Sequence, residues 1–489
     1  MKTGLEPGRW AVFRYDLDCG WPDAMDGASD SAVAVVQDLK DRGRKQGQPF
    51  LISPSGRPDV RINAFFSSRK MGSKSPLTWR KYSYSLGLWL NFLTVLGQEW
   101  DTATEEDAEY FKEWRITEAA NAERVAPSTF RGDLVALRSF YKWAAPRYGV
   151  ADPVALADDY DLMPHGPRQK DIKWLDPAGW RRWRDLGLRG LDVDGRPDPA
   201  FGARNEQRDV AFAEGLYGTG LRLTEWASIL VCELPEDDPS RGFSTRWLAN
   251  ACAKRGYGHK YWIPRRTLLE VLSYLEGARA RAVRRAQRAG RYERLGRVRL
   301  VLDVQREHLV VLEPDGRQTR PAIDAISPVM RRRLFCRTAQ GLEPLAVWLN
   351  EDGLPRVPHG WQHTFDTANA RVDRLGFPGL RVTPHMARHS FCLRWYSIGK
   401  LVYEAKLEHL GEAERRDFRE QFGDTWDLVA TMVGHRNPQT TKEHYLEPFR
   451  ALDIELLLQH AAGADLPGFL ATYLAQHPRV RTDPLRDAG

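Results

Sequence analysis

The chain has 489 residues, with 72 lysines and arginines against 65 aspartates and glutamates, a formal net charge of +7 and a pI near 9.1. A chain of this length can bury two or three cores, so it needs no disulfide or metal to stay folded. Its five cysteines are far apart, no run of about 18 apolar residues could span a membrane, and the first residues lack the apolar core of a signal peptide. We therefore expect a cytoplasmic protein.

Residues 1–60 mix short apolar runs with Gly, Pro and Asp, and we expect an N-terminal extension there. The stretches "SPLTWRKYSYSLGLWLNFLTVLG", "TEEDAEYFKEWRI" and "APSTFRGDLVALRSFYKWAAPRYG" then repeat apolar residues at helical spacing. They predict an all-helical module over residues 61–155. Five basic residues of this module are candidate DNA-backbone contacts, although solvated helix faces commonly carry such residues: Arg80, Lys81, Arg131, Arg138 and Lys142.

A linker and a mixed segment follow the helical module. Prolines at 153, 164 and 167 and mixed charges predict an extended linker over residues 156–172. Beyond it, helix patterns alternate with two strand candidates, "RWLANACAKRGYGHKYWIP" and "RVRLVLDVQREHLVVLEPDGR". In the first, Gly256 and Gly258 would make the turn of a hairpin. The arginine-rich stretch "GARARAVRRAQRAGRYERLGRVR" suits phosphate groups, and a solvated helix face is the alternative interpretation.

The stretch "TPHMARHSFCLRWYSIG" predicts a helix. Thr383 fits its N-cap, Pro384 its first turn, and Gly399 the position just past its end. His385 and Arg388 would share one face near the helix N-terminus, where backbone N–H groups already favour an anion. Both side chains could therefore meet one phosphate.

Two other interpretations of this helix remain open. His385 and His389 have the spacing of zinc ligands in metalloprotease helices, but Met386 stands where those helices have glutamate, and no further ligand is obvious nearby. We therefore expect no metal. Alternatively, His385 is a structural histidine and Arg388 a surface cation.

Three further blocks accompany this helix. Downstream, "LVATMVGHRNPQTTKEHYLEP" carries Gly434-His435, a turn with proline, and Tyr445. Upstream, "LYGTGLRLTEWASIL" places Arg222 after a Gly-Thr-Gly turn, and Lys254 lies in the predicted hairpin between them. These four blocks, in this order, resemble the tyrosine recombinase (phage-integrase-like) family. The resemblance covers roughly residues 175–460 as the catalytic domain, and the preceding helical module is similar to the core-binding domain.

The resemblance implies six catalytic residues: Arg222, Lys254, His385, Arg388, His435 and Tyr445. Lys260 is a rival for the lysine role, because the glycines of the hairpin are arranged differently from the family pattern. His435 would complete the hydrogen bonds to the phosphate. Glu225 is interpreted as a supporting acid that orients a catalytic side chain or makes a plain salt bridge, and His389 as a structural histidine.

The chemistry explains why these residue types belong together. Attack on a phosphodiester concentrates negative charge, which Arg222 and Arg388 can neutralise without a metal ion. His385 would accept the proton of the Tyr445 hydroxyl, and Lys254 would protonate the leaving 5′ oxygen. Each residue alone is more often an ordinary structural or surface residue, but that interpretation of all of them requires four independent coincidences in the right order. No cofactor is expected.

The resemblance implies a mainly α fold with a small β component (α+β). The catalytic domain would span residues 173–462, with a basic insertion near 277–346, and a C-terminal helix and tail would occupy 463–489. The implied function is a site-specific recombinase or integrase that moves a mobile element through a 3′-phosphotyrosine. Its partners would be double-stranded DNA attachment sites, three further copies in a tetramer on synapsed DNA, and an excision factor, at the nucleoid in the cytoplasm. The alternatives are a type IB topoisomerase-like enzyme and a catalytically silent DNA-binding regulator.

Overall fold

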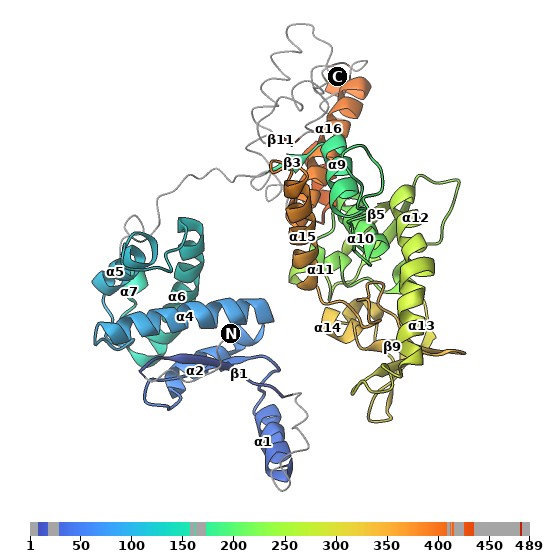
Figure 1. The fold of residues 1–489 in the computed structure, drawn as a ribbon. Coiled ribbons are helices and arrows are strands. Elements are labelled where there is room, and N and C mark those ends of the chain that lie inside the picture. Colours follow the sequence, from blue (N-terminus) through green and yellow to red (C-terminus); the bar gives the residue numbers. More distant parts are fainter. Residues whose placement is uncertain are drawn as a thin grey trace. The chain divides into compact units, whose positions relative to one another are not determined.

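The computed structural model describes residues 8–17, 29–156, 162, 173–407, 411, 413–414, 425–434 and 480–481. The described chain is mainly helical with several small sheets, which confirms the predicted fold class (Figure 1). Its internal contacts divide it into two compact units, Met1–Arg168 and Gln169–Gly489. We call them the N-terminal and C-terminal units.

The described elements of the N-terminal unit are β1 (Ala11–Arg14), α1 (Ser29–Asp41), β2 (Pro49–Ile52), α2 (Val60–Ser67), α3 (Arg69–Gly72), α4 (Pro76–Val95), α5 (Glu105–Ile116), α6 (Pro127–Tyr148) and α7 (Pro153–Leu156). Helices α4, α5 and α6 lie where apolar spacing predicted helices. The Ser75 side chain caps α4, and Thr104 forms a capping box with Asp107 at the start of α5. Gly149, with φ of 67°, ends α6.

Aromatic rings fill the core of the N-terminal unit. Trp89 donates from Nε1 to the Tyr141 hydroxyl at 2.9 Å, and that hydroxyl donates to the Trp100 carbonyl at 2.8 Å. These bonds satisfy polar atoms that would otherwise be costly to bury. Strands β1 and β2 pair antiparallel, and Leu51 of β2 is fully buried in the same core as the three long helices. Part of the N-terminal extension therefore belongs to this unit's core.

The described elements of the C-terminal unit are β3 (Trp174–Leu175), α9 (Pro177–Gly187), α10 (Glu206–Thr219), α11 (Leu223–Trp226), β4 (Phe243–Leu248), β5 (His259–Pro264), α12 (Arg265–Tyr274), α13 (Ala280–Arg288), β6 (Arg299–Val304), β7 (Leu309–Leu312), β8 (Gln318–Thr319), α14 (Pro328–Arg331), β9 (Leu334–Thr338), β10 (Gly341–Pro344), α15 (Gly360–Arg374), α16 (Pro384–Leu407), α18 (Thr425–Met432) and β11 (Val480–Arg481). Short 3₁₀ turns lie at Val231–Glu233, Lys254–Gly256 and Ile323–Ala325, and a π-helical turn at Leu275–Arg279 joins α12 to α13.

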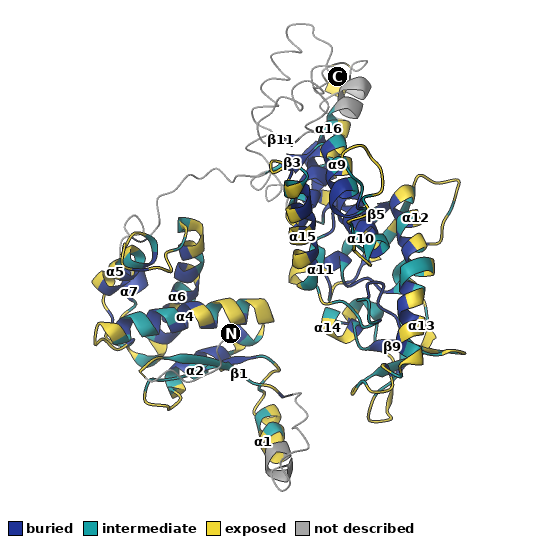
Figure 2. Cartoon of the chain, in the orientation of Figure 1, coloured by how far each residue is buried: buried dark blue, intermediate teal, exposed yellow. Residues whose placement is uncertain are grey.

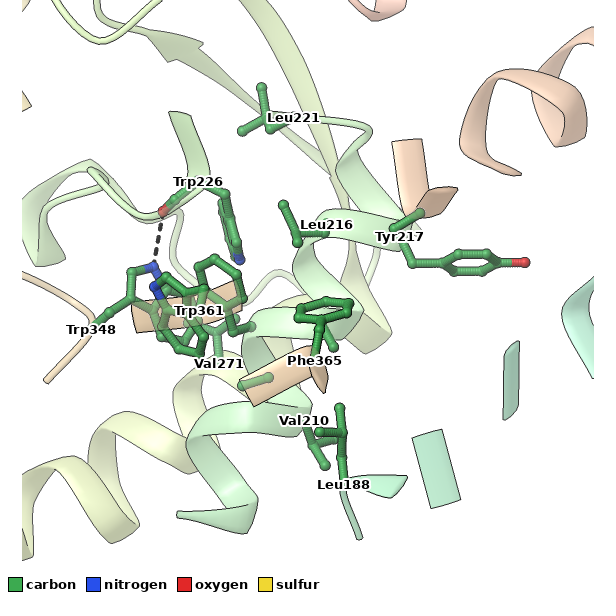
Figure 3. Packing of buried hydrophobic residues seen from close by; sticks show 14 of the residues in the cluster. Leu188, Val210, Leu216, Tyr217, Leu221, Trp226, Val271, Trp348, Trp361 and Phe365 are labelled. Carbon is green, nitrogen blue, oxygen red and sulfur yellow. Dashed lines mark hydrogen bonds between the residues drawn. The ribbon is translucent and has the colours of Figure 1, made fainter. Parts of the chain in front are cut away.

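Helix α10 is the central helix of this unit. It is coloured as buried in Figure 2, and α12 and α16 pack against it. Around it the rings of Phe212 and Trp361 stack with centroids 3.4 Å apart, and Trp348 donates from its indole to the Trp226 carbonyl at 2.9 Å (Figure 3). This packing holds α10 in the core of the unit, and the candidate site begins just beyond the end of the helix.

The two strand candidates of the sequence form strands in the structure. Strands β4 and β5 pair antiparallel, with Leu248 opposite His259 at the tip. The arginine-rich stretch is helical through α13, and the chain then forms a five-stranded sheet of order β10-β9-β6-β7-β8. The segment 277–346 is therefore an ordered helix and sheet, with its own small core around Val301, Leu309 and Val311.

One helix end was predicted wrongly. Helix α16 does not stop before Gly399 but continues to Leu407. A Cβ atom on Gly399 would lie 2.5 Å from Cγ2 of Thr425, the first residue of α18. Glycine is therefore needed at this position for the close approach of α18 and not to end the helix.

Several predicted segments lie outside the described residues. These are most of the stretch "DCGWPDAMDGASDS", most of the linker 156–172, and the helices predicted after Tyr445. Within the C-terminal tail, β11 is described, and Val480 and Arg481 pair in parallel with Trp174 and Leu175 of β3. The tail thus returns to the beginning of the C-terminal unit.

Candidate active site

The first predicted arginine follows the end of α10. The helix ends at Gly220, whose φ of 67° lies in the left-handed region. A side chain there would be strained and would meet the Phe391 ring at 2.4 Å, so the turn requires glycine. Leu221 is 1% exposed and anchored in the core beside α10 (Figure 3). The backbone position of Arg222 is therefore fixed by the two residues before it.

Glu225 holds Arg222 in place. Its carboxylate is fully buried, and it accepts hydrogen bonds from the backbone N–H and from Nη1 of Arg222, both at 2.8 Å. Burial opposes ionisation, but the charges of Arg222 and Arg388 and the hydrogen bonds from Arg222 outweigh it and lower the pKa of Glu225. The Arg222 side chain remains 23% exposed. Glu225 thus orients the Arg222 guanidinium from the buried side, while part of the Arg222 side chain remains accessible to solvent.

Lys254 lies at the first position of the 3₁₀ turn between β4 and β5, and its side chain is exposed. Its backbone N–H donates to Oε1 of Glu225 at 3.3 Å, so one carboxylate joins the hairpin to Arg222. Burial, then the neighbouring charges of Arg222, Arg255 and Arg388, lower the pKa of Lys254. Its ammonium is therefore a stronger acid than that of an ordinary lysine.

The rival lysine lies elsewhere on the hairpin. Lys260 is within β5, opposite Trp247 of β4, and it is exposed. The hydrogen bond to Glu225 is made by Lys254.

Arg388 is 1% exposed and connects three segments of the chain. From α16 it donates through Nη1 to the Gly220 carbonyl at 2.5 Å and through Nη2 to the Val433 carbonyl at 2.8 Å. Since Gly220 precedes Arg222 by two residues, the backbone that carries the first arginine lies beside the second. The structure therefore brings Arg222, Lys254 and Arg388 to one place.

The rings of the two histidines of the helix lie close together, one turn apart and tilted by 58° to each other. Thr383 caps α16 as predicted, accepting through its hydroxyl from the Met386 N–H at 3.3 Å. His385 in the first turn is exposed, whereas His389 is 9% exposed. Their ring centroids are 4.3 Å apart. His385 is thus the one of the two that solvent, and hence a substrate, can reach.

His435 and Tyr445 lie outside the described residues. The last described residue before them is Gly434, with φ of 67°. A Cβ atom on Gly434 would lie 2.3 Å from Nδ1 of His259. Gly434 therefore packs directly against the His259 ring.

Sequence reasoning missed His259. It begins β5, close to Lys254 along the hairpin. Burial and the positive charge of Arg388 lower the pKa of His259 against the opposing charge of Glu225, so its neutral form is favoured. Its position directly after Gly258 did not mark it, because its contact with Gly434 joins residues far apart in sequence.

The candidate DNA-backbone contacts of the N-terminal unit lie on α4 and α6. Arg80, Lys81, Arg131 and Lys142 are exposed and Arg138 is half-buried. A Cβ atom on Gly132 would lie 2.1 Å from the Lys81 ammonium, so Lys81 lies across α6 beside Arg131.

Within the described ranges, no three His, Cys, Asp or Glu side chains are grouped as a metal ion would require. Among the same residues, no helix is both long and apolar enough to cross a membrane.

Comparisons with known proteins identify the helical module. Residues 64–147 match the family model of the phage integrase N-terminal SAM-like domain. Solved structures with similar folds include XerH site-specific recombinase bound to palindromic difH substrate in a post-cleavage complex, at 12% identity, covering 81% of each chain with a TM-score of 0.44. They also include XerA recombinase, at 14% identity, covering 82% of this chain and 97% of that one with a TM-score of 0.31.

A third is Tn1549 transposon integrase in complex with circular intermediate DNA, at 16% identity, covering 72% of this chain and 83% of that one with a TM-score of 0.38. No curated protein matches the chain. Residues 64–147 are therefore similar to the phage integrase N-terminal SAM-like domain, and the four motif blocks that follow in order resemble the tyrosine recombinase (phage-integrase-like) family.

Proposed function

We propose that this chain is a site-specific recombinase that cuts and rejoins duplex DNA through a covalent 3′-phosphotyrosine. The observation that carries the proposal is the arrangement of Arg222, Lys254 and Arg388 around the buried carboxylate of Glu225. A phosphodiester under attack becomes five-coordinate and more negative, and cations fixed in advance stabilise that charge at little cost of reorganisation.

Strand cleavage would form one bond, break another and transfer two protons. The Tyr445 oxygen attacks phosphorus and forms the P–O bond, while His385 accepts the proton of the hydroxyl. The bond from phosphorus to the 5′ oxygen breaks, and the Lys254 ammonium, whose pKa is lowered, protonates the leaving oxygen. Arg222 and Arg388 neutralise the phosphate, and His435 completes its hydrogen bonds.

The covalent product keeps the energy of the broken ester. A second DNA end with a free 5′ hydroxyl can therefore reverse the attack without ATP. Cutting at one attachment site and joining to another integrates or excises a mobile element. Four copies on two synapsed sites would supply the four strand cleavages of a complete exchange.

A nicked suicide substrate tests the chemistry, because loss of the short cleaved strand traps the enzyme on DNA. The unaltered chain should form an adduct that survives denaturation, and Tyr445→Phe should not. Tyr110→Phe is the matched control, since Tyr110 is an exposed tyrosine of α5 that bonds only to Glu106 among described side chains. An adduct in Tyr445→Phe would refute the assigned nucleophile and direct attention to His444.

Two assays separate this function from its alternatives. A recombinase requires its attachment sites, whereas relaxation of a plasmid without them by a monomer would identify a type IB topoisomerase-like enzyme. Gel filtration with paired DNA sites should give a tetramer. A chain that bound DNA but formed no adduct with any substrate would instead be a silent regulator.

A further inference from the structure

The N-terminal unit contains a pocket that lies outside the candidate active site. Its volume is about 850 Å³, within the range of small-molecule sites, and we call it the N-terminal pocket. Its walls come from β2 and from Tyr15 and Arg44 of the N-terminal extension, from α2 and α3, and from the end of α6. Strand β2 packs against α2, and β1 packs against α4 (Figure 1). The extension thus completes a cavity that the helical domain alone would leave open.

Hydrogen bonds to the backbone hold the walls together. The Asn63 side chain of α2 both accepts from the Leu51 N–H and donates to the Leu51 carbonyl, each at 2.8 Å, as a neighbouring strand would. Gln48 donates through its buried side chain to the Phe66 carbonyl at 2.8 Å. Since all three bonds join the extension to α2, the pocket is formed before any ligand arrives, which lowers the entropic cost of binding.

The pocket is lined by four cations and no carboxylate. The cations are Arg44, Arg69, Lys70 and Arg147. Among the described residues, none of the four has an acidic partner within salt-bridge distance; Arg44 instead donates to the Ser67 hydroxyl. Arginines elsewhere in this chain are commonly paired, as Arg61 is with Asp101. An uncompensated group of cations in a concave site attracts an anion.

Aromatic rings form the rest of the lining. Tyr15 and Phe50 stack with ring centroids 4.7 Å apart, and Trp143 lies at the end of α6. The Arg147 guanidinium lies 5.4 Å from the Trp143 ring centroid, and Arg44 lies 5.9 Å from that of Tyr15. Flat rings next to cations match a ligand with a planar face and a phosphate, which is the combination found in a nucleotide.

We propose that the N-terminal pocket binds a nucleotide of a DNA strand, with its phosphate against the four cations and its base against the aromatic rings. The proposal rests on the proposed function for its choice of DNA over a free nucleotide. It differs from the candidate backbone contacts on α4 and α6 because none of those five residues lines the pocket, although Lys142 directly precedes the pocket residue Trp143.

Fluorescence anisotropy with a short labelled single strand, a labelled duplex and a mononucleotide tests the proposal on the full chain. The double variant Arg69→Gln/Lys70→Gln changes two exposed side chains and should leave the fold intact. If both contact phosphates, it should weaken single-strand binding about 25-fold at 0.1 M salt and reduce the log–log salt slope by about 1.4. Tyr15→Leu should weaken it at least about fivefold through lost stacking.

Arg42→Gln is the matched control, since Arg42 is 68% exposed, pairs with Asp38 and does not line the pocket. Unchanged affinity and slope in the double variant, or an equal loss in Arg42→Gln, would overturn the proposal. A mononucleotide that bound as tightly as the strand would also overturn it, because the pocket would then be an effector site. Adduct formation on the suicide substrate is measured separately: it depends on Tyr445, and its failure would leave the pocket result standing.

Discussion

Replacing Glu225 by glutamine should destabilise the C-terminal unit and slow DNA cleavage together. The glutamine has the same shape, but one of its two terminal atoms is an NH₂ donor. That donor would face either the backbone N–H or Nη1 of Arg222, both of which now donate to the carboxylate at 2.8 Å. The charges of Arg222 and Arg388 would also lose their buried counter-ion.

The magnitude follows from the burial of the carboxylate. Removing one partner of a buried ion pair costs about 3–5 kcal/mol, and we expect about 3 because glutamine keeps one acceptor. With an m-value of about 3 kcal/mol/M, the urea midpoint should fall by about 1 M. Cleavage should slow on the order of 100-fold, since Arg222 would no longer be held in position.

The pH dependence gives an independent readout. The pKa of Glu225 is lowered below its usual value of 4.5, so its contribution to stability is present above that pH and is lost as the pH falls through the lowered value. The stability difference between the two proteins should therefore shrink in acid. Glu351→Gln is the control, because Glu351 pairs with Arg204 and Arg285 at the surface. Equal urea midpoints and equal cleavage rates for Glu225→Gln and the unaltered chain would refute the reasoning.

Three further predictions concern the same site. Gly220→Ala should lower the free energy of unfolding by about 2–4 kcal/mol in urea titrations, because of its φ of 67° and the contact with Phe391. Lys254→Ala should slow cleavage of an ordinary strand by about 10²- to 10⁴-fold, but much less with sulfur at the bridging 5′ position, since a thiolate leaves without a proton. Adduct formation should be unchanged in EDTA, because arginines supply the positive charge; inhibition reversed by Mg²⁺ would contradict this.

Local sequence patterns predicted the helices and the hairpin well, because their information lies within a few residues. Apolar spacing located α4, α5 and α6, and Thr383 marked the start of α16. The sheet in segment 277–346 was predicted only as partly β. Its parallel pairing of β6 with β9 joins residues far apart in sequence, which no local periodicity encodes.

The candidate site shows the same division between local and distant information. The motif blocks named Arg222 and Arg388 but could not choose between Lys254 and Lys260, since both lie on the predicted hairpin. The hydrogen bond from the Lys254 backbone to Glu225 depends on how the hairpin packs against α11. The central position of Glu225 could not be read from its spacing alone, because an acid three residues after an arginine is commonly just a surface pair.

Glycines illustrate why one residue type has several structural meanings. Gly220 ends α10 in the left-handed region, as a glycine after a helix predicts, and it also makes room for Phe391. Gly399 lies inside α16, where only the close approach of Thr425 requires it. Gly434 combines a positive φ with contact against the His259 ring. Two of these three glycines lie where the chain enters a predicted catalytic block, before Arg222 and before His435. A Cβ atom at Gly220 would push the backbone away from the Phe391 ring, so the position of the predicted catalytic residue Arg222 depends on a residue that has no side chain.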